Sequence, residues 1–110
     1  MLSKELLSDF TGRTVLEVAH IDGDELVYWF EVGNDDDSDR ILLNLLYEMS
    51  KSYILGRGKA PFIYIFAEDC CEVHLKENND QINHIRKFKG ENEIECMVKA
   101  CDWLFHNPEV

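Results

Sequence analysis

The sequence contains no long apolar run and has few basic side chains for its number of acidic ones. No stretch approaches the roughly 18 consecutive apolar residues that a membrane-spanning helix needs. The first residues, Met1 to Glu5, lack the apolar core and cleavage site of a secretory leader. These absences predict a cytoplasmic protein. Eleven basic side chains stand against 22 acidic ones, a formal net charge of −11, which argues against nucleic acids and anionic membranes as ligands.

Cysteine pairs at metal-binding spacing are also missing. The only approach to a zinc pattern is Cys70-Cys71-x-x-His74, which contains no Cys-x-x-Cys and has no second pair elsewhere. We therefore expect no cofactor at the thiols. The four cysteines are predicted to be reduced and to pack as small apolar residues; they are Cys70, Cys71, Cys96 and Cys101.

A calcium loop is suggested by spacing and excluded by the rest of its pattern. Asp35, Asp37 and Asp39 have the one-three-five spacing of an EF-hand loop. The position that requires glycine holds Arg40, and the twelfth position holds Leu46. A solvated acidic loop is the better interpretation, so no metal site is predicted.

Sequence patterns for catalysis are equally incomplete. Gly56-Arg57-Gly58-Lys59 follows a predicted helix and precedes a predicted strand, the reverse of a phosphate-binding loop. Cys70 and His74 lie on the same face of a predicted strand but two pleats apart, roughly 13 Å along the backbone. That separation prevents a direct nucleophile–base contact. We predict no catalytic residues.

What the chain does contain is enough apolar material for one domain over residues 1–110, with 45% apolar residues. Ser3 is placed to cap a short helix over Lys4 to Phe10. Strands over 13–21 and 26–32 flank the turn Asp22-Gly23-Asp24-Glu25, and Asp-Gly is a strong hairpin signal.

An acidic segment follows the hairpin. We expect residues 33–39 to form a loop in which Ser38 caps the next helix and Asp39 lies against its positive end. Apolar residues then recur at three- and four-residue steps from Ile41 to Tyr53, which predicts a long amphipathic helix that ends near Gly56.

The second half is organised around Pro61 to Phe66, an unbroken apolar run typical of a central strand covered on both faces. Cys71 to Lys76 alternates and predicts a strand with one wet face. Gln81 to Phe88 fits either an edge strand or a helical turn, and we favour the strand. Asn92, with Glu95 three residues later, predicts the start of the last helix.

The resulting order is α-β-β-α-β-β-β-α. It predicts an α+β domain with one mostly antiparallel sheet of about five strands and two long helices packed on it.

The acidic segment and the neighbouring strand supply the candidate site. Exposed aromatic residues ringed by carboxylates are typical of binding surfaces for basic partners. Trp29 shares a strand face with Glu31, although packing of Trp29 beneath the first helix is an equal alternative. The candidate partner-binding residues are Trp29, Glu31, Asp35, Asp36, Asp37 and Asp39.

These observations indicate a small acidic binding protein without enzyme activity. Bacterial immunity proteins and phage inhibitors of host defence share its size and charge, but no motif links the chain to either group. Two alternatives stay open. One is a self-associating structural or accessory domain that uses the Gln81 to Phe88 edge or the Trp29 face and forms a homodimer. The other is an enzyme built on Glu72 and His74.

Overall fold

Each of the first two helices is followed by three strands in the computed structural model, which describes residues 2–110 and all their side chains except those of residues 19–22 and 81. The first half comprises α1 (Lys4–Thr11), β1 (Val15–Asp22), β2 (Glu25–Val32) and β3 (Asp35–Leu42). The second half comprises α2 (Leu43–Gly56), β4 (Lys59–Ala67), β5 (Cys70–Glu77), β6 (Asp80–Gly90) and α3 (Glu93–Phe105).

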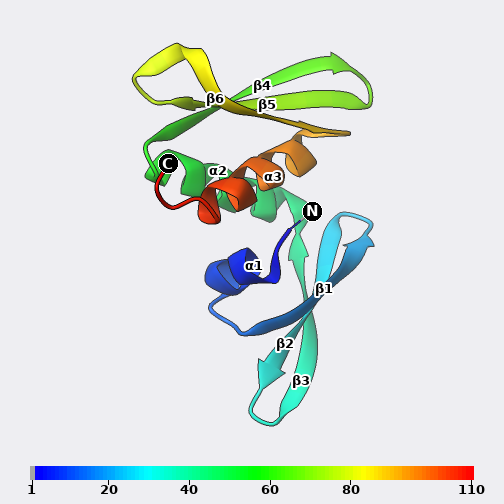
Figure 1. Ribbon diagram of the computed structural model, residues 1–110. Coiled ribbons are helices and arrows are strands. Elements are labelled where there is room, and N and C mark those ends of the chain that lie inside the picture. The colour runs from blue at the N-terminus through cyan, green and yellow to red at the C-terminus, as the bar shows by residue number, and fades with distance from the viewer. Residues whose placement is uncertain (1) are drawn as a thin grey trace.

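The strands form two separate antiparallel sheets rather than one. Sheet A has the order β1-β2-β3 and sheet B the order β4-β5-β6. Figure 1 shows α2 and α3 side by side between sheet B and the lower part of the molecule, where α1 lies against sheet A. The predicted α+β class and antiparallel pairing are confirmed, whereas the single five-stranded sheet is wrong. No helix in the described part of the chain is long and apolar enough to cross a membrane.

The structure contains one strand that the sequence did not predict. This strand is β3, and it lies where a loop was predicted. Gly33-Asn34 forms a two-residue turn, and Val32 and Asp35 face each other across it. Gly33 has φ 61°, a conformation that glycine adopts at little cost. Pairing with β2 along its whole length overrides the poor strand propensity of aspartate. The predicted helix start is therefore wrong as well: Ser38 lies within the strand, and Leu42 precedes α2 without a side-chain cap.

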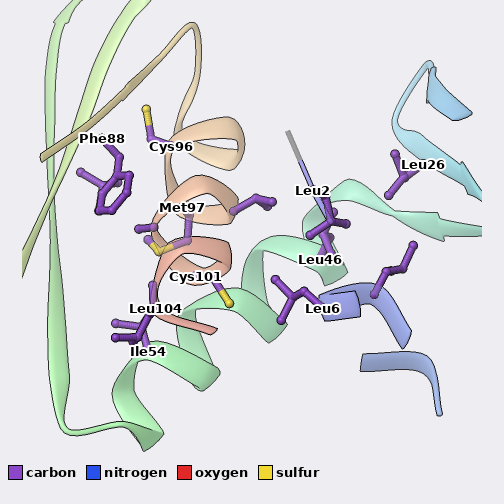
Figure 2. Packing of buried hydrophobic residues seen from close by; sticks show 14 of the residues in the cluster. Leu2, Leu6, Leu26, Leu46, Ile54, Phe88, Cys96, Met97, Cys101 and Leu104 are labelled. Atoms are coloured by element: carbon purple, nitrogen blue, oxygen red, sulfur yellow. The ribbon is translucent and has the colours of Figure 1, made fainter. Parts of the chain in front are cut away.

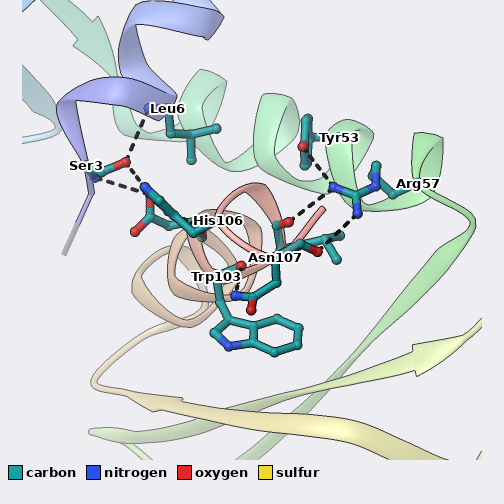
Figure 3. A network of polar contacts seen from close by, with 9 residues as sticks. Ser3, Leu6, Tyr53, Arg57, Trp103, His106 and Asn107 are labelled. Atoms are coloured by element: carbon teal, nitrogen blue, oxygen red, sulfur yellow. Dashed lines mark hydrogen bonds and ion pairs between the residues drawn. The ribbon is translucent and has the colours of Figure 1, made fainter. Parts of the chain in front are cut away.

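The core joins the helices to both sheets. Leu46 and Ile54 of α2 face Met97, Cys101 and Leu104 of α3, and all five are fully buried. Figure 2 shows that Leu6 of α1 and Leu26 of β2 extend the same cluster toward sheet A. The segment before α1 is joined to α3, because the Ser3 hydroxyl donates a hydrogen bond to the Asp102 carboxylate (Figure 3).

β4 is an edge strand, not the central strand that its apolar run predicted. β5 occupies the centre of sheet B, and its inward residues Cys71, Val73 and Leu75 are buried as the alternation predicted. Beyond Tyr64 the side chains of β4 are open, with Ile65 65% and Phe66 62% exposed. An irregularity in the β4–β5 pairing lies between Ile65 and Ala67. The apolar run therefore ends on a surface rather than in the core.

The remaining predictions for helix ends and strands hold. The Ser3 side chain accepts from the Leu6 amide and caps α1. Asn92 accepts from the Glu95 amide at 2.8 Å and caps α3. The ambiguous segment near Gln81 belongs to β6, which confirms the preference for a strand.

Candidate functional site

All six candidate residues lie on the hairpin formed by β2 and β3, which projects away from the helices at the lower end of Figure 1. Every residue from Glu31 to Arg40 is exposed. In the pairing of the two strands, Glu31 faces Asp36, Val32 faces Asp35, and Trp29 faces Ser38. The hairpin thus brings the acidic segment and the Trp29 strand together, as the sequence suggested, but through pairing rather than through a loop.

The carboxylates are divided between the two faces of the hairpin, because directly paired residues share a face. Asp37 pairs with Phe30 and Asp39 with Tyr28, so these two aspartates lie on the face that continues into the core. Asp36 lies on the other face of the hairpin, where it pairs with Glu31 across the two strands. The hairpin tip therefore presents negative charge in both directions rather than one flat acidic patch.

Asp39 differs from the other aspartates because it has an internal cation. The Arg13 guanidinium donates to the Asp39 carboxylate at 2.7 Å and to the Tyr28 hydroxyl at 2.9 Å, and it stacks 4.0 Å from the centre of the Phe30 ring. The hydrogen bond from Arg13 lowers the pKa of Asp39 below its usual range. No such ion pair reaches Asp35, Asp36 or Asp37 within the part of the chain that the structure describes.

Trp29 does not pack beneath α1. It lies opposite Glu17 and Ser38, on the face away from Tyr28, and the buried cluster includes Tyr28 but not Trp29. Its side chain is half-buried. Trp29 therefore offers partial aromatic exposure beside Glu31, the arrangement that the sequence made one of two alternatives.

Charge is distributed unevenly along the molecule. Residues 59–90, which include sheet B, carry five acidic and five basic side chains, whereas the rest of the chain carries 17 acidic and six basic ones. The excess of negative charge therefore belongs to sheet A and the helices. The field of the protein is strongest away from sheet B.

The outward side chains of sheet B are more buried than the alternating sequence of β5 predicted. Lys76 is only 7% exposed, and its ammonium lies 4.5 Å from the centre of the Phe62 ring. The rings of Tyr64 and His74 have their centres 4.3 Å apart. Glu72 lies 3.8 Å from His74 Nε2. Burial lowers the pKa of His74, which favours the neutral form of this imidazole.

Three of the four thiols pack as predicted, and the fourth does not. Cys71, Cys96 and Cys101 are buried and Cys70 is exposed. The Cys96 thiol donates to the Cys71 carbonyl at 3.1 Å, and burial raises the pKa of both Cys96 and Cys101 to about 12. Among the described residues, no three His, Cys, Asp or Glu side chains are grouped so that they could hold a metal ion.

The Gly56 to Lys59 segment connects the end of α2 to the end of α3 and to β5. Figure 3 shows Arg57 pointing at the end of α3, where it donates to the carbonyls of Leu104 at 3.1 Å and Pro108 at 3.2 Å. Lys59 is buried and pairs with Glu77 at 3.2 Å. Both cations of this segment are therefore engaged by the protein itself.

Sequence reasoning missed one surface feature, which is a pair of hollows on either side of Glu48 on α2. Their walls come from α1, α2 and the start of α3. Only the packing of three helices brings these residues together, so no local pattern could have indicated them.

Comparison of the chain with protein-family models, with curated proteins and with solved structures finds no match.

Proposed function

We propose that the chain is a non-enzymatic binding protein that occludes a basic surface of a protein partner, as an inhibitor or immunity-type protein of bacterial or phage origin does. The observation that carries this proposal is the projecting hairpin. Asp35, Asp36 and Asp37 are exposed and form no ion pair with a basic side chain among the described residues. Unpaired carboxylates at a projecting tip are available to lysine and arginine side chains.

The uneven charge supports directed association. A strong local field raises association rates with an oppositely charged protein by about 10- to 1,000-fold at low salt. Residues 13–42, which include sheet A and the hairpin, carry nine acidic and two basic side chains, so we expect the negative field to be strongest at that end of the molecule. A basic partner would therefore meet the hairpin first, and Trp29 would add desolvated contact area beside Glu31.

Neutralising the hairpin tests the proposal. We expect Asp35→Asn/Asp36→Asn/Asp37→Asn to reduce capture of basic proteins from lysate by about tenfold or more, since each lost charge weakens association. The matched control is Glu5→Gln/Asp69→Asn/Glu109→Gln, which removes the same charge at exposed sites outside the hairpin. Equal capture by the two variants would refute the proposal.

Self-association is the second candidate, and the exposed end of β4 favours it. Tyr64, Ile65 and Phe66 are exposed apolar residues at the end of an edge strand, where a strand of a second copy could pair. Light scattering of the wild type and of Ile65→Thr/Phe66→Ser tests this. A dimer that dissociates in the variant would support it, and a wild-type monomer at micromolar concentration would exclude it.

A further inference from the structure

The outward side of α2 carries apolar residues that α1 and the start of α3 cover only in part. Leu45 is 51% exposed, and Met49 and Tyr53 next to it are only half-buried. Exposed leucine alone is common on protein surfaces. Here it adjoins a wider group of incompletely covered apolar residues, which is the usual make-up of an interaction site.

Two hollows give this side its shape. One has a volume of about 620 Å³ and lies between α2 and the start of α3. The other has a volume of about 590 Å³ and lies between α1 and α2. Glu48 borders both hollows. Tyr47 and Ile94 give the first hollow its apolar wall, and Phe10, Leu45, Met49 and Tyr53 give the second its wall.

The charges around the hollows all have one sign. Asp9 lines the second hollow, Glu93 lines the first, and Glu48 lies between them, while no lysine, arginine or histidine among the described side chains lines either. None of the three carboxylates forms an ion pair with another described residue. The pKa of Tyr47 is raised by its burial and then by Glu93 and Glu48, which places both carboxylates near its hydroxyl.

We propose that this α2 face, with its two hollows, binds a short amphipathic segment of a basic protein partner. Apolar side chains of the segment fill the hollows, and its lysine or arginine side chains meet Asp9, Glu48 and Glu93. The proposal rests on the proposed function, because it takes the partner to be basic, and it adds a second contact surface to the hairpin. A second copy of the chain is a poorer occupant, because its own α2 face would bring identical carboxylates into contact.

A synthetic amphipathic helix of leucine and lysine, labelled with a fluorophore, is a direct probe. Its affinity is measured by fluorescence anisotropy for the wild type and for Glu48→Gln/Glu93→Gln and Leu45→Ser. We expect each variant to bind about tenfold more weakly, as loss of a charge pair or an apolar anchor does at small interfaces. The control Asp69→Asn/Glu109→Gln, with the same net charge as the double variant, should change affinity less than about twofold.

Three results would overturn the inference. They are equal weakening in the control, weakening only in Asp35→Asn/Asp36→Asn/Asp37→Asn, and a wild-type dimer in light scattering that dissociates in Leu45→Ser. The second result would leave the hairpin proposal intact. Conversely, a hairpin variant that captures basic proteins normally would refute the hairpin proposal while the α2 face could still bind the probe.

Discussion

At the scale of residues, the acidic segment is less uniform than its composition. Asp39 is tied to Arg13, which lies 26 positions earlier, whereas its neighbours have no such partner among the described residues. The local composition does not single out the Arg13 contact, because that contact depends on how the segment between α1 and β1, which holds Arg13, is placed beside β3. The acidic composition of the segment made these aspartates candidates, but it did not show how their surroundings differ.

The Arg13–Asp39 pair gives a pH dependence of known sign. Because the pKa of Asp39 is lowered in the folded state, the stabilisation is complete above the ordinary carboxyl pKa of about 3.9 and is lost as pH falls through the folded value. We expect Arg13→Gln to move the Asp39 pKa back upward, as followed by carboxyl-carbon NMR. A titration midpoint that does not change in the variant would show that the contact is absent in solution.

The thiols should differ sharply in reactivity. Cys70 is exposed, whereas the other three are buried and have raised pKa values, about 12 for Cys96 and Cys101. The thiolate is the reactive form, so an aromatic disulfide reagent at pH 8 should label one thiol in the native protein and four after unfolding. Rapid labelling of Cys96 would contradict the packing of α3 against β5.

Two neighbouring leucines on α2 provide a matched test of the core. Leu46 is fully buried and Leu45 is 51% exposed. We expect Leu46→Ala to lower the free energy of unfolding by about 2–5 kcal/mol, from lost burial and the cavity left behind. Leu45→Ala should change it by less than about 1 kcal/mol. Urea denaturation measures both, and a reversed order would mean that α2 is rotated relative to its described position.

At the scale of elements, the sequence was informative wherever periodicity and capping agreed. The caps Ser3 and Asn92 and the inward residues of β5 were predicted as observed, whereas the outward face of β5 is more buried than predicted. The failures have one cause, which is that strand neighbours are set by tertiary pairing. The composition of 35–39 favoured a loop although Gly33-Asn34 is itself a hairpin signal, and the apolar run of β4 could not reveal that β5 would take the centre.

Amide hydrogen exchange tests the revised assignment of 35–42. β3 is at the edge of sheet A, so alternate amides should be protected by bonds to β2 while those between them exchange freely. A loop would leave them all unprotected. A helix capped by Ser38 would leave the amides of its first turn largely unprotected and would protect the amides only from about Leu42 onward, so a lack of protection from Asp35 to Ile41 would contradict β3.

At the scale of the whole molecule, charge and shape act together. The chain extends over 50 × 33 × 16 Å, and its negative excess lies outside the segment that forms sheet B. An elongated body with one strongly acidic end orients an approaching basic protein before contact. The net charge favoured a basic partner, but only the fold shows that the acidic segments lie at one end of the molecule.

Site-specific photo-crosslinking tests the central claim most directly. A photoreactive amino acid replaces Val32, which is 51% exposed at the hairpin tip, or Ile82, which is 89% exposed on sheet B. The account predicts that the Val32 position crosslinks to a protein at a segment rich in lysine and arginine, and that the Ile82 position does not. Crosslinks from Ile82 without any from Val32 would contradict it.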